Sequence, residues 1–189
     1  MDEFSEYVHI KLQEKIEQKI QEFVKDGVSS FHVVADFDGT LTNGFTHGKK
    51  VNSGYACIRD GDYLPKEFLK KANTLFEYYY PIEISHTISL EEKNIKMKEW
   101  WQKVWELLKN YGITLQILQE IAQKNKNTLR DGTKDFLNSL QRENIPILIF
   151  SAGIGNLIQE ILNVENIELS NIHIISNFFE FDGNGKCIG

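Results

Sequence analysis

The chain has 189 residues, 41% of them apolar, a formal net charge of −6 and an isoelectric point of about 5.4. This composition predicts a soluble globular protein with one core and room for a small inserted domain, and the negative charge argues against a nucleic-acid polymer as a partner. The sequence shows no apolar run of membrane-spanning length, no signal-peptide pattern and no cysteine cluster, so we expect a cytoplasmic protein that does not enter a membrane.

The first predicted element is an amphipathic helix. Apolar side chains recur at every fourth residue, separated by Lys, Glu and Gln; they are Phe4, Val8, Leu12, Ile16, Ile20 and Val24. This spacing places them on one face of a helix that should end near Gly27. We expect that face to pack on the protein core.

A strand with two aspartates at its end follows this helix. Residues 31–35 form an apolar run without polar alternation, which predicts a strand buried on both faces of a parallel sheet. Asp36 and Asp38 come directly after it, where open α/β sheets bind their ligands. In an extended backbone the two carboxylates point to the same side, and two like charges that close need a cation or a proton. The alternative interpretation is a solvated Asp-Gly turn.

The middle of the chain, residues 48–128, is predicted to form a helical cap. Helices are expected over residues 65–80, from the capping-box residue Ser89 to about residue 110, and over residues 114–123. The second of these helices contains Trp100, Trp101 and Trp105. Helix-spaced aromatic side chains are usually buried, so the three tryptophans predict the packing face of this subdomain.

The remaining chain alternates helices with strands. We expect a helix over residues 131–142, a strand at 147–150, a second helix around 157–162, a strand at 172–177 and a hairpin near 182–185. This order predicts a doubly wound α/β core with the cap inserted after its first strand. The predicted division is therefore 1–47 (helix, first strand and catalytic loop), 48–128 (cap) and 129–189 (continuation of the core).

Ser151 ends its strand in the same topological position as Asp36. A hydroxyl there, with the backbone N–H groups that begin the next helix, makes an anion site. The pair Gly153 and Gly155 could belong to a dinucleotide-binding fingerprint, but position 158, where the third glycine would stand, is Ile.

The stretch Asp36-Phe37-Asp38-Gly39-Thr40 resembles the first motif of the haloacid dehalogenase superfamily, Asp-x-Asp-x-Thr. The resemblance implies that Asp36 is a nucleophile, that Asp38 is a general acid/base, that both bind magnesium and that Ser151 binds the phosphoryl group. The residue types suit this chemistry, because one carboxylate can attack phosphorus while a second protonates the departing oxygen. Asp38 favours phosphate transfer over dehalogenation, in which no alkoxide leaves.

Longer stretches resemble the cytosolic pyrimidine 5′-nucleotidase (type III) family over nearly the whole chain. They are Tyr79-Tyr80-Pro81-Ile82-Glu83-Ile84, Glu99-Trp100-Trp101, Ile149-Phe150-Ser151-Ala152-Gly153-Ile154-Gly155 and Ser176-Asn177-Phe178. The resemblance implies a magnesium-dependent phosphatase of pyrimidine or 7-methylguanosine nucleoside 5′-monophosphates, with Ser151 and Ala152 at the substrate. It also implies that Glu83 binds the base; a solvated surface carboxylate is the alternative.

Two departures from the family pattern keep other interpretations open. Val104 stands where the family has a nucleotide-contacting serine, and the chain ends at Gly189, before the family's third-motif lysine and fourth-motif Gly-Asp-x-x-Gly-Asp. We therefore expect a C-terminally truncated core with an unpaired side on its first strand. The alternatives are a phosphatase of another small metabolite and a catalytically impaired truncated paralogue with a binding role. Base preference and oligomeric state are left open.

Overall fold

A parallel three-stranded sheet forms the centre of the computed structural model, which describes residues 11–46, 48–168 and 170–189. The strands are β1 (Val33–Ala35), β4 (Ile147–Ile154) and β5 (Ile172–Asn177), in the order β1-β4-β5. Val33 pairs with Ile147, which in turn pairs with Ile172. Within the described chain β1 is therefore an edge strand, and its carboxyl end lies beside the middle of β4.

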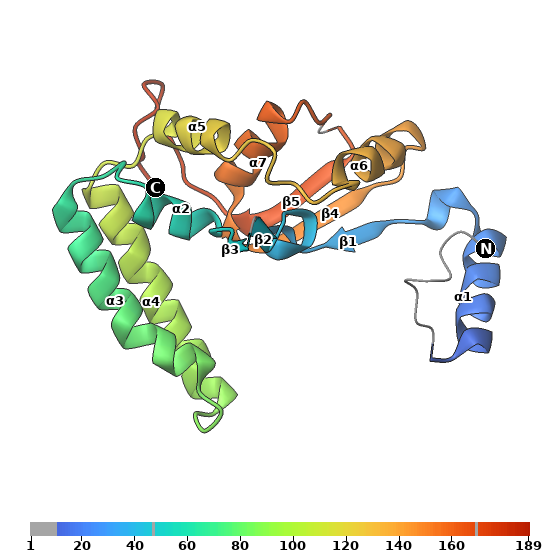
Figure 1. The fold of residues 1–189 in the computed structure, drawn as a ribbon, viewed down its shortest axis with the longest axis horizontal. Coiled ribbons are helices and arrows are strands. Elements are labelled where there is room, and N and C mark those ends of the chain that lie inside the picture. The colour runs from blue at the N-terminus through green and yellow to red at the C-terminus, as the bar shows by residue number, and fades with distance from the viewer. Residues whose placement is uncertain (1–10, 47, 169) are drawn as a thin grey trace.

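Three helices lie over one face of this sheet (Figure 1). They are α5 (Leu115–Lys124), α6 (Thr133–Arg142) and α7 (Gly155–Val164), and α5 packs against α7. The side chains of β4 alternate between this face and the other one, so that Ile147, Ile149 and Ser151 are buried beneath the helices. This layer contains most of the core.

The opposite face of the sheet is open in the described part of the chain. Val34, Phe150 and Ile175 are 60%, 61% and 53% exposed, although all three are large apolar residues. The prediction that residues 31–35 form a strand buried on both faces is therefore wrong here. The apolar sequence indicates a preference for burial, but no described helix covers this second face.

The cap forms an arm of two long antiparallel helices (Figure 1). These are α3 (Lys66–Ile84) and α4 (Leu90–Asn110), and α3 extends beyond the predicted end because Pro81 is accommodated inside it. Ser89 caps α4 as predicted, since its Oγ accepts a hydrogen bond from the backbone N–H of Glu92 (3.2 Å). A short helix, α2 (Gly54–Asp60), and a small hairpin of β2 (Phe45–Thr46) and β3 (Lys49–Lys50) connect this arm to β1.

The N-terminal helix is confirmed only in part. Residues 13–26 form α1 (Gln13–Asp26), which ends at Gly27, while Phe4 and Val8 lie outside the described residues. No residue of α1 is buried, and Val24 is 76% exposed. The expected packing of its apolar face on the core is wrong in this structure, where α1 stands apart from the sheet and the cap (Figure 1).

The other predicted strands and helices are confirmed within a few residues, including the hairpin, where Phe181 and Cys187 form an antiparallel bridge. The predicted division at residues 47 and 128 stays a prediction. None of the helices in the described ranges is both long and apolar enough to cross a membrane.

Candidate active site

The segment after β1 is a tight turn, not the continued extension that the sequence suggested. Residues 37–41 form this turn, which is closed by the Thr42 N–H donating to the Phe37 carbonyl oxygen (3.1 Å). Asp38 and Gly39 have non-helical backbone angles, and Gly39 has a φ of 76°, a conformation that glycine adopts without steric cost. Buried Phe37 and buried Thr42 fix the two ends of the turn, and the Gly39 N–H donates to Thr42 Oγ1 (2.8 Å). We call residues 36–42 the aspartate loop.

The aspartate loop gives its two carboxylates different surroundings. Asp36 is exposed, and its Oδ2 accepts a hydrogen bond from the Thr40 hydroxyl (3.0 Å). Asp38 is half-buried, and its burial raises the pKa of the carboxyl; the nearby Asp36 charge acts in the same direction, while a hydrogen bond from the Gly54 N–H opposes it. Asp38 is therefore more easily protonated than an ordinary aspartate, as a proton donor requires.

The end of β4 lies against Asp38, as its topological position predicted. Ser151 is buried, and its Oγ accepts a hydrogen bond from the Gly153 N–H (3.1 Å). A Cβ atom at Gly153 would lie 3.3 Å from Asp38 Oδ2 and 3.2 Å from Ser151 Oγ. Glycine thus lets the backbone come between these two side chains. Ser176 of β5 fixes this segment by donating its hydroxyl to the Gly153 carbonyl oxygen (2.9 Å).

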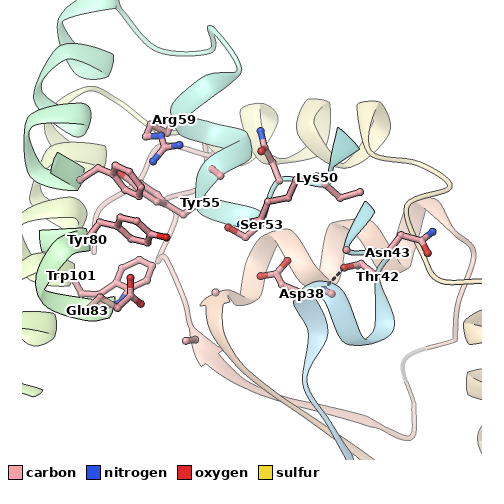
Figure 2. A pocket seen from close by; sticks show the side chains of 18 of the residues that line it. Asp38, Thr42, Asn43, Lys50, Ser53, Tyr55, Arg59, Tyr80, Glu83 and Trp101 are labelled. Atoms are coloured by element: carbon pink, nitrogen blue, oxygen red, sulfur yellow. Dashed lines mark hydrogen bonds between the residues drawn. The ribbon is translucent and has the colours of Figure 1, made fainter. Parts of the chain in front are cut away.

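A cavity of about 580 Å³ extends from Asp38 to the cap helices (Figure 2). It is lined by residues from the aspartate loop, the β3–α2 segment, α2, α3, α4 and the end of β4. Of the predicted site residues, Asp38, Glu83 and Ala152 line it. Asp36 and Ser151 are not among its lining residues. Asp36 lies two residues from Asp38 in the aspartate loop, and Ser151 is bonded to Gly153, and both Asp38 and Gly153 line the cavity.

Aromatic rings form the cap side of the cavity. Phe76 stacks on Tyr80 with their ring centroids 4.8 Å apart, and Trp100 lies 6.1 Å from Phe76. Trp100 and Trp101 are partly buried against the core, as predicted, but they also line the cavity. Trp101 and Glu83 both line the cap side of the cavity (Figure 2). A flat, partly apolar ligand with a polar edge would suit this wall.

Two buried polar atoms at this wall have no hydrogen-bond partner among residues 11–46, 48–168 and 170–189. They are the Tyr55 hydroxyl and the Trp100 Nε1. Burial raises the pKa of Tyr55 to about 12, so this hydroxyl stays protonated and available as a donor. Arg59 lies 4.7 Å from the centre of the Phe76 ring and forms an ion pair with Asp60 (2.7 Å). The cavity therefore combines stacking surfaces with hydrogen-bonding groups.

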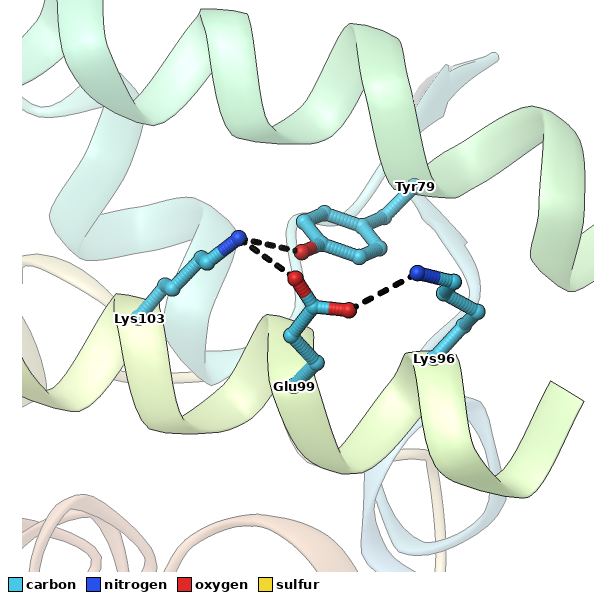
Figure 3. Close-up of polar contacts among 4 residues, drawn as sticks. All are labelled: Tyr79, Lys96, Glu99 and Lys103. Carbon is cyan, nitrogen blue, oxygen red and sulfur yellow. Dashed lines mark hydrogen bonds and ion pairs between the residues drawn. The ribbon is translucent and has the colours of Figure 1, made fainter. Parts of the chain in front are cut away.

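A polar network joins α3 and α4 next to the aromatic wall (Figure 3). Glu99 forms ion pairs with Lys103 (2.6 Å) and Lys96 (3.0 Å), and Lys103 also donates to the Tyr79 hydroxyl (2.8 Å). Buried Tyr79 stacks on Trp100 with a centroid distance of 5.6 Å. The bonds from Lys103 and then Lys96 lower the pKa of Glu99 to about 2.

The comparisons with known proteins agree with this geometry. The parallel sheet with an aspartate loop after its first strand is a haloacid-dehalogenase-like fold. It is shared with cytosolic 5′-nucleotidase IIIB, whose crystal structure was solved with bound cytidine. The two structures match with a TM-score of 0.85 and 34% identity, over 95% of this chain and 60% of that one. The model of the pyrimidine 5′-nucleotidase (UMPH-1) family matches residues 39–189. The chain belongs to this family.

Curated relatives carry a related name. The chain is 35% identical to 7-methylguanosine phosphate-specific 5′-nucleotidase A of Xenopus laevis and 36% identical to the human 7-methylguanosine phosphate-specific 5′-nucleotidase. The matches cover 96% and 90% of this chain. The chain spans 63% and 58% of the length of these two relatives.

Several lining residues were not singled out from the sequence. Tyr55, Arg59 and Phe76 lie on helices, where their spacing resembles that of ordinary packing or surface residues. The one available signal was the density of aromatic residues in the cap, which does not indicate which rings face a cavity. Val104, at the position of the family's cap serine, is 2% exposed and belongs to the core.

Proposed function

We propose that the protein hydrolyses nucleoside 5′-monophosphates with a pyrimidine or 7-methylguanine base, releasing the nucleoside and phosphate. The observation that carries this proposal is one cavity that has Asp38 at its core end and an aromatic wall with Glu83 at its cap end. A nucleoside monophosphate has the matching polarity, with an anionic phosphate at one end and a flat base at the other. The names of the relatives support the same substrates.

The chemistry follows from the two aspartates. An Asp36 carboxylate oxygen attacks the phosphorus atom, and the bond between phosphorus and the 5′ oxygen breaks. Asp38 gives its proton to this departing oxygen, so that the nucleoside leaves as an alcohol. Asp38 then takes a proton from water, whose oxygen attacks the phosphorus of the aspartyl phosphate. Phosphate leaves, and Asp36 returns to its carboxylate form.

Asp36 and Asp38 are also the residues that would hold a magnesium ion. Magnesium prefers oxygen ligands and is often bound by one or two carboxylates together with water and substrate phosphate, so this pair fits. Within the described residues no group of three or more His, Cys, Asp or Glu side chains gathers around a possible metal position. When bound, the ion would offset the repulsion between the anionic phosphate and the carboxylates.

The cap side would select the base. The stacked rings of Phe76 and Tyr80, with Trp100 and Trp101, offer faces against which a base can lie. Glu83 lines the same region and can accept hydrogen bonds from an exocyclic amine, which cytosine and 7-methylguanine carry and uracil lacks. The cytosolic names of relatives support a cytoplasmic location for this activity.

Phosphate release by the full-length protein tests this proposal. Cytidine, uridine and 7-methylguanosine 5′-monophosphates would be compared with ribose 5-phosphate and phosphoserine at equal magnesium. We expect the nucleotides to be hydrolysed at least tenfold faster. Equal or faster release from the other two phosphates would instead identify a phosphatase of another small metabolite. Nucleotide binding without release would identify a catalytically impaired binding protein.

A further inference from the structure

The carbonyl groups of the aspartate loop are bound by a segment that lies about ninety residues away in the sequence. Arg130 Nε donates to the Thr40 carbonyl oxygen (3.0 Å), and one of its terminal nitrogens donates to the Gly39 carbonyl oxygen (2.6 Å). The Leu41 carbonyl accepts from the Arg130 backbone N–H (2.9 Å) and from the Thr133 hydroxyl (3.1 Å). Three consecutive carbonyls of the loop are therefore bound by two residues.

The same segment fixes the residues that follow the loop. Thr42 and Leu129 form an isolated antiparallel bridge, and the Asn43 N–H donates to the Thr128 carbonyl oxygen (2.8 Å). The Asn43 side chain adds a bond to the Leu129 carbonyl oxygen (3.1 Å). Residues 128–133 thus run alongside the loop where the chain returns from the cap to the core.

The loop needs such a partner because its turn is not continued as a helix. Backbone carbonyls that lie outside regular secondary structure need hydrogen-bond partners from elsewhere in the chain or from water. A guanidinium group suits this task, since its planar donors can bind two neighbouring oxygens at once. Thr40, whose carbonyl accepts from Arg130, also donates its hydroxyl to Asp36 Oδ2 (3.0 Å). Arg130 is thereby connected to Asp36 through one residue.

We propose that Arg130 is a positioning residue that sets the reaction rate by holding the aspartate loop in its reactive conformation, a role that rests on the proposed nucleotidase activity. Arg130 is exposed and does not line the cavity, so it has no direct contact with the substrate site. Its loss should displace Asp36 and Asp38 without removing a side chain that lines the cavity. A misplacement of about 1 Å at reacting groups can reduce the rate about a hundredfold.

Lys134 provides a matched control. It lies four residues further on, is also exposed, and also donates its side-chain cation to a backbone carbonyl, that of Glu165 (2.6 Å). Glu165 is the residue that follows α7 and is not part of the aspartate loop (residues 36–42). Lys134→Met therefore removes a similar interaction from the first turn of α6 without changing a residue that is bonded to the loop.

The experiment compares kcat and KM of the full-length wild type with those of Arg130→Met, Arg130→Lys and Lys134→Met. We expect Arg130→Met to lower kcat about tenfold to a hundredfold with KM changed less than about threefold, because the loop moves while the cap end of the cavity, lined by Phe76, Tyr80 and Glu83, stays intact. Arg130→Lys should recover part of kcat, since an ammonium group can bind one of the two carbonyls. Lys134→Met should keep kcat within about twofold of wild type.

The two proposals fail differently. An active wild type with unchanged kcat in Arg130→Met would overturn the positioning role alone, as would equal losses of kcat in Arg130→Met and Lys134→Met. A wild type that releases no phosphate from any nucleotide would overturn the proposed function, and the positioning role with it. If Arg130→Met melts below the assay temperature, kcat of Arg130→Lys is compared with kcat of Lys134→Met. A lower kcat in Arg130→Lys supports the positioning role, and equal values overturn it.

Discussion

Asp36 and Asp38 have different surroundings. In a continuous extended strand, two aspartates separated by one residue would point to the same side and share one environment. The turn at Gly39 leaves Asp36 exposed beside the Thr40 hydroxyl and places Asp38 half-buried against the cavity. Burial raises the pKa of Asp38. Different environments at neighbouring carboxyl groups favour different roles, with one acting as the nucleophile and the other as the proton donor.

The role of Asp38 predicts a dependence on the leaving group. Asp38→Asn should slow release from cytidine monophosphate by about a hundredfold or more, because the nucleoside oxygen leaves only when it gains a proton. With nitrophenyl phosphate, whose leaving group needs no proton, the same variant should slow the step that forms the phosphoenzyme much less. Single-turnover measurements with both substrates check this, with Asp26→Asn on α1 as a control. Equal losses for both substrates would contradict the role.

Glu83 should act on base selection. Glu83→Ala removes the carboxylate at the cap end of the cavity and should lower kcat/KM for cytidine monophosphate about tenfold or more. The rate with ribose 5-phosphate, which has no base, should change little. Steady-state kinetics with both substrates provide the comparison. A uniform decrease would show that Glu83 supports the structure or the chemical step and not the base.

The sequence predicted the aspartates and Ser151 because short motifs at strand ends carry a chemical meaning by themselves. It did not predict Arg130, whose bonds to Gly39 and Thr40 arise only when the chain has returned from the cap. It also did not predict which side of Trp100 and Trp101 faces the cavity. Helical spacing shows which side chains share a face but not what that face borders.

At the scale of elements, the α3–α4 arm carries the aromatic wall, and the Glu99 network holds its two helices together (Figure 3). Glu99 bonds to Lys96 and Lys103 on its own helix, and Lys103 reaches the Tyr79 hydroxyl on α3. Since Tyr79 stacks on Trp100, this network is connected to the cavity wall.

The lowered pKa of Glu99 predicts how the network depends on pH. A carboxylate whose pKa falls from 4.5 to about 2 on folding stabilises the protein above pH 4.5, and this contribution is lost as the pH falls towards 2. Glu99→Gln should therefore lower the melting temperature slightly at pH 7, and the difference from wild type should shrink below pH 4.5. The effect should be small, because these ion pairs are partly exposed to solvent.

Thermal melts at several pH values test this, with Glu106→Gln on the same helix as a control outside the network. If the difference in melting temperature between Glu99→Gln and wild type stays constant from pH 7 to pH 3, the carboxylate charge contributes nothing to stability. A larger difference at low pH would contradict the direction of the pKa shift.

On the scale of the whole molecule, the most unusual feature is an apolar sheet face without cover in the described chain. Val34, Phe150 and Ile175 are more than half exposed there, and among the residues that the structure describes β1 pairs with one strand, β4. Exposed apolar patches and free strand edges promote association. The order of the elements followed from the sequence pattern, but the uncovered face did not, because an apolar strand does not indicate what covers it.

Residues 1–189 expressed alone should therefore self-associate. Phe150→Lys places a charge in the middle of the open face and should raise the monomer fraction in sizing chromatography. Phe136→Lys, on α6 and 43% exposed, is the control and should have little effect. If residues 1–189 ran as a uniform monomer at high concentration, or if both variants behaved alike, the open face would not be the cause of association.

In the proposed reaction, Asp36 forms a covalent bond to the phosphoryl group of a nucleotide. The most direct measurement is rapid acid quenching of the full-length protein during turnover of cytidine monophosphate with magnesium, followed by mass spectrometry of its peptides. We predict one added phosphoryl group on the peptide that contains Asp36. The matched variant Asp36→Asn should show neither this modification nor phosphate release, while its melting temperature stays close to that of wild type. Phosphate release at a wild-type rate by Asp36→Asn, or a phosphoryl group found only on another peptide, would contradict the account.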